Sequence, residues 1–176
     1  MHAAVHAANS ALAALAALAA LGRNGPAPSG ERLVPGLWVD LDTSGGAGDV
    51  MAETGGGLLR LTLAPRKAGH WCTLNIDLGN APRDGAALLG VAIRSRAPQS
   101  TTARLAVRSF LPGGGMHDSF FGDYLVAFGT ESTHCDVLWL ARDPVLQAAA
   151  DWRTLIVFFD PEGFDISLMD MRLFAA

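Results

Sequence analysis

Four side chains suited to binding a sugar are spaced two residues apart in one short segment, at Trp71, Thr73, Asn75 and Asp77. Alternate residues of an extended strand share one face, so these four would form a continuous strip. A flat aromatic ring packs against the C–H groups of a sugar, and planar polar side chains bind its hydroxyl groups. The strip is therefore a candidate ligand-binding face.

The same strip also has an ordinary structural explanation. It could be the solvent-facing side of a sheet, with Trp71 covered by a loop or by an N-terminal helix. Three arginines would enlarge the candidate face if their strands lie beside this one in the same sheet, namely Arg94, Arg104 and Arg108.

A second candidate is the segment 112–124, which begins with three consecutive glycines, Gly113–Gly115. Glycine permits unusual backbone angles and close approach of a ligand. We expect a long loop here, and long loops commonly carry binding residues. From it we select His117, Asp118 and Tyr124 as candidate ligand-binding residues, while noting that aromatic side chains in loops also anchor them to the core.

Catalytic chemistry has little support in the sequence. A base lies beside potential partners only in His117-Asp118 and in His134-Cys135-Asp136. Adjacent strand residues point to opposite faces, which is poor geometry for a thiolate–imidazole pair. The sequence contains no nucleophile elbow, phosphate-binding loop or metal-ligand spacing, so we name no catalytic residue and no metal ligand.

We expect no cofactor, with one alternative. A structural calcium ion needs several oxygen ligands, which Asp40, Asp42 and Asp170 could supply in part. The other explanation for these residues is solvated aspartates at strand ends.

Short apolar runs separated by turn residues predict the elements that position these side chains. Several alternate with period two, as half-buried strands do, and no βαβ rhythm interrupts them. We therefore predict an all-β antiparallel sandwich, a jelly roll, with an immunoglobulin-like sandwich as the near alternative. The expected strands are 37–41, 58–63, 71–78, 88–95, 103–110, 124–128, 135–140, 154–159 and 164–174.

The last two runs, 154–159 and 164–174, are predicted to form a hairpin around the turn 160–163. The apolar side chains of the second run change face at Leu168-Met169, which predicts a β-bulge. The first run is apolar on both faces. We therefore expect the N-terminal helix to cover its outer face, which would move any ligand away from it.

An alanine- and leucine-rich helix is predicted for residues 1–22, followed by a Gly/Pro-rich linker at 23–35 and the sandwich at 36–176. The segment 3–21 could pack on the domain, on a second copy or on a partner. It could also be a secretory signal, although no Lys or Arg precedes it. A membrane span is disfavoured, because alanine is only weakly apolar. A cytoplasmic and an exported location both remain open.

Composition narrows the class of partner. The chain has 176 residues, half of them apolar, and a net charge of −4, which argues against binding to nucleic acid. Cys72 and Cys135 fall in expected strands, where buried thiols are the ordinary outcome and a disulfide between neighbouring strands is the alternative.

Three segments resemble the galactose-binding-like jelly-roll carbohydrate-binding modules attached to enzymes of polysaccharide metabolism. They are Gly36–Asp42, Trp71–Leu78 and Asp170–Phe174. The resemblance implies a non-catalytic module that binds a glycan or a polysaccharide-processing partner. The alternatives are an interaction or assembly subunit that uses the N-terminal helix, and a small glycan-active enzyme that uses His117.

Overall fold

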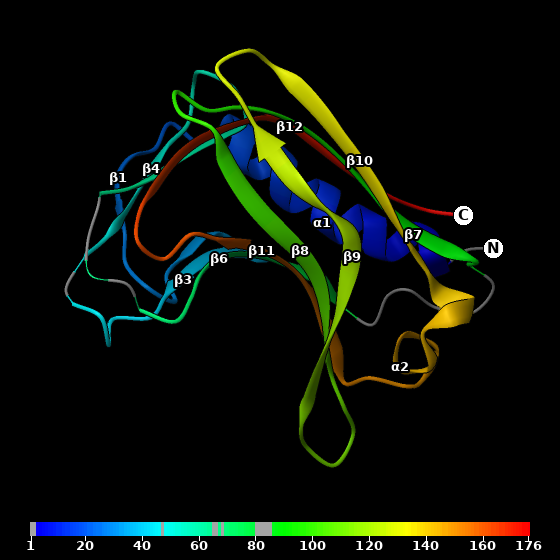
Figure 1. Ribbon diagram of the computed structural model, residues 1–176. Helices are drawn as coiled ribbons and strands as arrows, with labels where there is room; N and C mark the ends of the chain where they lie inside the picture. The colour runs from blue at the N-terminus through cyan, green and yellow to red at the C-terminus, as the bar shows by residue number, and fades with distance from the viewer. Residues whose placement is uncertain (1–2, 47, 65–66, 68, 80–85) are drawn as a thin grey trace.

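The computed structural model describes residues 3–46, 48–64, 67, 69–79 and 86–176, which form two antiparallel six-stranded sheets and an N-terminal helix, α1 (Ala3–Ala20) (Figure 1). Sheet A has the order β1 (Asn24–Ala27), β4 (Val50–Glu53), β5 (Leu59–Leu63), β12 (Phe164–Ala175), β7 (Leu88–Arg96) and β10 (Ser132–Trp139). Sheet B has the order β2 (Arg32–Val34), β3 (Leu37–Leu41), β6 (Cys72–Gly79), β11 (Trp152–Phe159), β8 (Thr101–Phe110) and β9 (Met116–Ala127). A short 3-10 turn, Leu140–Arg142, and helix α2 (Pro144–Gln147) connect β10 to β11.

The predicted all-β sandwich with an N-terminal helix is confirmed, and each expected run overlaps a strand. The segment 23–35, expected to be a linker, instead contributes β1 and β2, which lie at the outer edges of the two sheets. These strands have only four and three residues, and β1 contains Pro26. Proline is tolerated at a sheet edge, where its missing N–H is not needed, so the Gly/Pro-rich composition concealed both strands.

The segment 112–124 is mostly strand, so the expected long loop is wrong. The connection between β8 and β9 is a tight one, in which Gly113, Gly114 and Gly115 have φ values of 87°, 96° and 96°. Only glycine adopts such angles readily, and the three glycines let β9 begin at Met116. His117, Asp118 and Tyr124 therefore lie on a strand with fixed faces.

The predicted C-terminal hairpin is also wrong, because its two strands belong to different sheets. β11 pairs with β6 and β8 in sheet B, whereas β12 pairs with β5 and β7 in sheet A. The turn at 160–163 carries the chain across the sandwich, and Phe159 and Phe164 stack on each other at its base with ring centroids 4.5 Å apart. The predicted bulge in β12 is confirmed by a register shift between Leu168 and Asp170.

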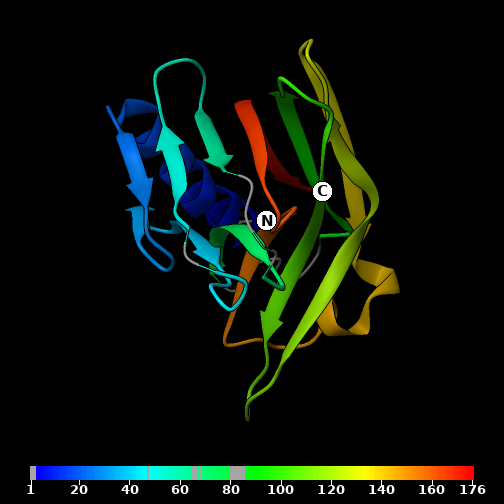
Figure 2. The same ribbon diagram turned by 60° about the vertical axis from the view of Figure 1, so that its left-hand side comes forward.

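Helix α1 lies between the two sheets rather than outside them (Figures 1 and 2). It contacts β6 of sheet B and β12 of sheet A, and its buried residues Ala11, Ala14, Leu15 and Leu18 join the core formed by the inward faces of both sheets. The helix is thus docked on the domain, but the expectation that it covers the outer face of β11 is wrong.

The outer face of β11 belongs to a separate environment. Leu155, Val157 and Phe159 belong to the core between the sheets, whereas Ile156 is buried outside that core. Strand alternation places Phe158 on the same outer side as Ile156.

Within the described residues, the structure contains no helix with the length and apolarity that crossing a membrane requires.

Replacing Leu18 by alanine should lower the free energy of unfolding by about 3 kcal/mol, because a fully buried leucine leaves a cavity in a packed core. The matched control is Leu12→Ala on the same helix, whose side chain is 40% exposed and whose loss should cost less than about 1 kcal/mol. Urea unfolding followed by tryptophan fluorescence measures both. Equal, small losses would contradict the docking of α1 in the core.

Candidate functional site

The outer face of sheet B carries a continuous row of side chains across five neighbouring strands. Direct pairing of residues gives the order Asp40 (β3), Thr73 (β6), Phe158 (β11), Arg104 (β8) and Tyr124 (β9). Neighbouring strands are about 4.8 Å apart, so the row is about 19 Å long. A ligand lying across the strands would contact polar groups at one end and aromatic rings at the other.

A second, more apolar row lies beside the first. It consists of Trp38, Asn75, Ile156, Ala106 and Phe120, again in the order of the strands. Asn75 is the polar member of this row and is 4% exposed. The two rows together form the centre of the face.

A third row completes the face on the other side, with Asp77, Thr154, Arg108 and Asp118. Arg108 donates from Nε and Nη2 to the two carboxylate oxygens of Asp118, both at 2.7 Å. This bidentate pair joins β8 to β9 and neutralises both charges.

Hydrogen bonds hold the polar end of the face in one arrangement. The indole Nε1 of Trp38 donates to Asp40 Oδ2 at 2.8 Å, and Asn75 Nδ2 donates to Thr73 Oγ1 at 3.0 Å. Asn75 Nδ2 also lies 3.4 Å from Asp40 Oδ2. The guanidinium carbon of Arg32 lies 4.8 Å from the centroid of the Trp38 ring. Side chains fixed in this way lose little conformational freedom when a ligand binds.

The other end of the face is an aromatic cluster on β11, β8 and β9. The guanidinium carbon of Arg104 lies 3.9 Å from the ring centroid of Phe120 and 5.8 Å from that of Tyr124. The rings of Phe120 and Phe158 have centroids 6.0 Å apart. Tyr124 is 57% exposed, so much of its surface is open to a ligand.

Trp71 lies at the margin of the same face. The amide of Asp42 donates to the carbonyl of Trp71 at 2.9 Å, which continues the pairing of β3 with β6 by one residue. Strand alternation places the half-exposed indole of Trp71 on the side of Thr73. The carboxylate of Asp42 accepts from the amide of His70 at 2.7 Å and so fixes the backbone just before Trp71.

Of the site residues predicted from sequence, the structure gathers Trp71, Thr73, Asn75, Asp77, Asp118 and Tyr124 on this face. His117 is the exception, because it pairs with the buried Ser109 and points to the opposite side of β9 from Asp118. Arg104 and Arg108 lie on the same face of sheet B, although β11 separates their strand from β6, whereas Arg94 lies on β7 in sheet A.

His117 lies near the start of α2, where Asp143 is the N-cap residue. Burial alone would raise the pKa of Asp143. The nearby hydroxyl of Ser119 and the hydrogen bonds from the amides of Leu146 and Val145, with a smaller contribution from the charge of His117, outweigh burial and lower that pKa. The imidazole of His117 thus lies on the side of β9 that faces Asp143, away from the candidate face.

Sequence reasoning did not assign Phe158, Ile156 or Trp38 to the face. The apolar outer side of β11 was the signal that could have identified the first two. An apolar outer side indicates that the strand is buried on both sides. Such burial is expected at the centre of a binding face as well as beneath a covering helix.

The residues considered for catalysis and for calcium do not come together. His134 and Cys135 point to opposite sides of β10, and Cys135 is exposed while Cys72 is buried on β6 in the other sheet. Asp170 lies on β12 in sheet A beside Arg172, far in the fold from Asp40 on sheet B. The described residues contain no group of three His, Cys, Asp or Glu side chains able to hold a metal ion.

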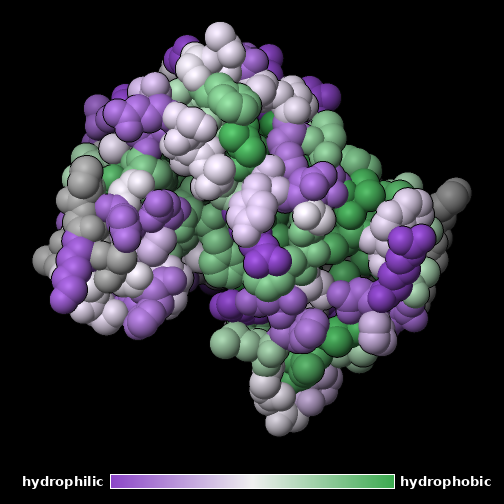
Figure 3. Space-filling view, viewed as in Figure 1, coloured by the Kyte–Doolittle hydropathy of each residue, from purple (hydrophilic) through white to green (hydrophobic). Residues whose placement is uncertain are grey.

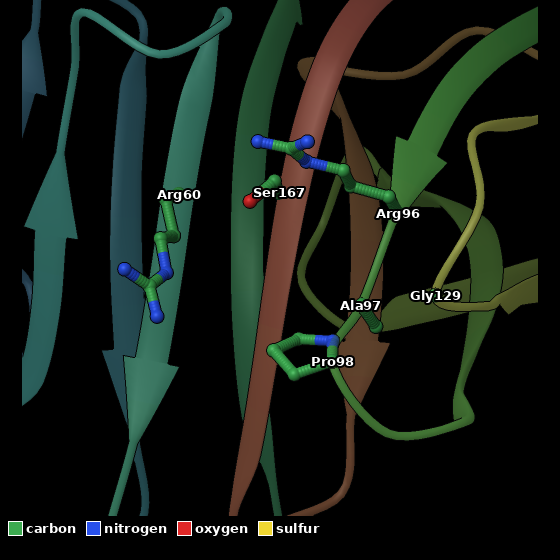
Figure 4. A pocket seen from close by; sticks show the side chains of 6 residues that line it. All are labelled: Arg60, Arg96, Ala97, Pro98, Gly129 and Ser167. Atoms are coloured by element: carbon green, nitrogen blue, oxygen red, sulfur yellow. The ribbon is translucent and has the colours of Figure 1, made fainter.

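Sheet A has a pocket of its own on its outer face, with a volume of about 310 Å³ (Figure 4). Ser167 pairs with Arg60 on one side and with Arg96 on the other. Arg60 is held by Asp165 through bonds of 2.9 and 2.7 Å, and this contact lowers the pKa of Asp165. None of the described residues lining the pocket is aromatic. It lacks the surface on which a sugar ring would stack.

The molecular surface is hollowed on the side of sheet B. Figure 3 shows a recess between the β8–β9 hairpin and the part of the molecule that contains β3 and β4, with β6 and β11 lying above it in the view of Figure 1. The rows described above therefore lie on the recessed side of the sandwich.

The sequence matches no family profile, and no curated protein matches it. Several solved structures with a similar fold are carbohydrate-binding modules. A CBM4 module has a TM-score of 0.60 at 12% identity, over 86% of this chain and 94% of that one. The CBM22-1 xylan-binding domain of Paenibacillus barcinonensis Xyn10C has a TM-score of 0.55 at 11% identity, over 88% and 95%.

A third similar structure is the family 11 carbohydrate-binding module from Clostridium thermocellum in complex with a β-1,3-1,4-mixed-linked tetrasaccharide. Its TM-score is 0.54 at 9% identity, and the match covers 87% of this chain and 96% of that one. The chain therefore has the β-sandwich fold of carbohydrate-binding modules, as the resemblance of its segments indicated.

The carboxyl group of Asp42 should titrate with a pKa of about 2, against an ordinary value of 3.8. Hydrogen bonds from the amide of Ser44, then from the amide of His70 and the hydroxyl of Ser44, stabilise the carboxylate. Because the pKa is lower in the folded state, the contribution to stability is present above pH 3.8 and is lost as the pH falls through about 2. Carboxyl ¹³C NMR titration measures the midpoint, and Ser44→Ala should raise it. A midpoint near 3.8 in the unmodified protein would show that these bonds do not form.

Proposed function

We propose that this protein is a non-catalytic module that binds a glycan on the outer face of sheet B. The observation that carries the proposal is the row from Asp40 to Tyr124, which presents fixed polar groups and aromatic rings on one recessed face. Sugar recognition needs both kinds of group within reach of one chain.

The exposed aromatic rings of the face supply the apolar contact. Tyr124, Phe120 and Trp71 are all partly exposed, so their rings can pack against sugar C–H groups without first being uncovered. Phe158 and Ile156 form the floor between them. This floor is on a central strand and is therefore rigid.

The polar end of the face would orient the bound sugar by accepting hydrogen bonds from its hydroxyl groups. Asp40 retains carboxylate lone pairs beyond those used by Trp38 and Asn75, and a carboxylate accepts strongly from hydroxyl groups. Because the Trp38–Asp40–Asn75–Thr73 network is already formed, it can bind hydroxyl groups at a small entropic cost.

The similar structures support the same proposal at the level of fold. They are named as modules that bind xylan or that hold a mixed-linked tetrasaccharide, and they match nearly the whole of this chain. By this analogy, a polysaccharide-processing enzyme would be the protein that such a module serves.

The arrangement of the chain favours glycan binding over the two alternative functions, an assembly subunit that uses the N-terminal helix and a glycan-active enzyme that uses His117. Leu15 and Leu18, which an assembly helix would offer to a partner, are buried in the core of the same chain. An enzyme built on His117 would need the imidazole on the recessed face, but the residue lies on the other side of β9.

Affinity electrophoresis in gels containing xylan, mixed-linked β-glucan, glucuronoxylan or alginate tests the proposal. Tyr124→Ala and Trp71→Ala should each weaken binding by about three- to ten-fold, because a single aromatic contact is lost. The matched control is Trp139→Ala, which removes an equally exposed aromatic ring from β10 in sheet A and should leave binding unchanged. Absence of retardation in every gel, or an equal effect of the control, would refute glycan binding on this face.

A further inference from the structure

The outer face of sheet B carries charged side chains at both of its ends. At the polar end, Arg32 on β2 lies over the ring of Trp38, which itself bonds to Asp40. Asp40 and Asp77 lie on β3 and β6, whereas Arg104 lies two strands from β6, on β8. Arg108 also lies on β8, but its charge is neutralised by Asp118. The uncompensated positive charge at the aromatic end of the face therefore belongs to Arg104.

Arg104 has neither an ion pair nor a hydrogen bond to any residue that the structure describes. Its row neighbours are Phe158 and Tyr124, and its guanidinium lies over Phe120. These rings hold the planar group in position through cation–π contact, but they accept none of its five N–H donors in the way an oxygen does. A positioned guanidinium with unused donors is suited to a planar oxyanion.

We propose that the glycan bound by this face carries a carboxylate, as a uronic acid does, and that Arg104 binds that carboxylate through two parallel N–H···O bonds. This inference rests on the proposed function and names the class of its ligand. The ring of the same sugar would lie against Tyr124, which is the exposed aromatic side chain beside Arg104 in the row.

The charge of Asp40, at the polar end of the face, predicts how uronic acids are spaced along the bound chain. Asp40 lies three strands from Arg104, about 14 Å away, and its negative charge disfavours a second carboxylate there. The face is thus suited to a chain in which a uronate is followed by neutral sugars. A polymer made only of uronates is a poorer fit.

Isothermal titration with glucuronoxylan, and with the same polymer after chemical reduction of its carboxylates to alcohols, tests this inference directly. Hyaluronate and alginate, each with its reduced counterpart, extend the comparison. For at least one polymer, the acidic form should bind at least about ten-fold more tightly than the reduced form. The reduced form lacks the carboxylate and therefore loses a charge-assisted hydrogen bond. The difference should shrink as salt is added.

Three variants assign the preference to one side chain. Arg104→Gln should abolish the difference between acidic and reduced polymer, while Arg104→Lys, which keeps the charge but not the fork, should retain part of it. The control is Arg96→Gln on sheet A, which makes the same change in net charge at an exposed arginine and should leave the difference intact.

The outcomes separate this inference from the proposed function. Equal binding of acidic and reduced polymers, or an equal loss for both in Arg104→Gln, would overturn the uronate assignment and leave glycan binding standing. Tighter binding of dextran sulfate than of every uronate polymer would overturn it in favour of a sulfated ligand. Failure of every polysaccharide to bind would remove the proposed function and this inference together.

Discussion

Burial of the α1 leucines between the two sheets is the interaction on which the rest of the structure depends. Leu15 and Leu18 fill space that opens between β6 and β12, and they belong to the same core as the inward residues of both sheets. Because the helix satisfies its apolar side inside the sandwich, it leaves the outer face of sheet B uncovered. The central strand β11 consequently presents Ile156 and Phe158 to the recessed face instead of to a helix. The position of one helix thus determines which surface remains available for binding.

Much of the fold could be predicted because strand alternation is a local property. Period-two spacing was enough to identify the longer strands, to place Thr73, Asn75 and Asp77 on one face, and to predict the bulge near Met169 from the change of apolar side. The short strands β1, β2 and β4 escaped prediction because three or four residues do not establish a period. Tertiary pairing, rather than local preference, makes them strands.

The composition of the face was harder to predict because it depends on which strands are neighbours. Arg94 and Arg104 look alike in the sequence, yet one lies on β7 in sheet A and the other on β8 in sheet B. The sequence of β11, with apolar residues on both faces, was equally ambiguous. A strand covered by a helix and a strand at the centre of a binding face can both have this pattern. His117 and Asp118 show the same limit, since a strand where a loop was expected sends adjacent side chains to opposite sides.

The passage of the chain from β11 to β12 across the sandwich has a consequence for synthesis on the ribosome. Without β12, β5 has no partner towards β7, and without β11, β6 has none towards β8. Each sheet would then consist of two separate pieces with exposed edges. Within the domain, β11 and β12 are therefore the strands that join both sheets, so neither sheet can be completed until the rest of the domain has been translated. Until then, the nascent chain exposes unpaired strand edges that favour aggregation and binding by chaperones.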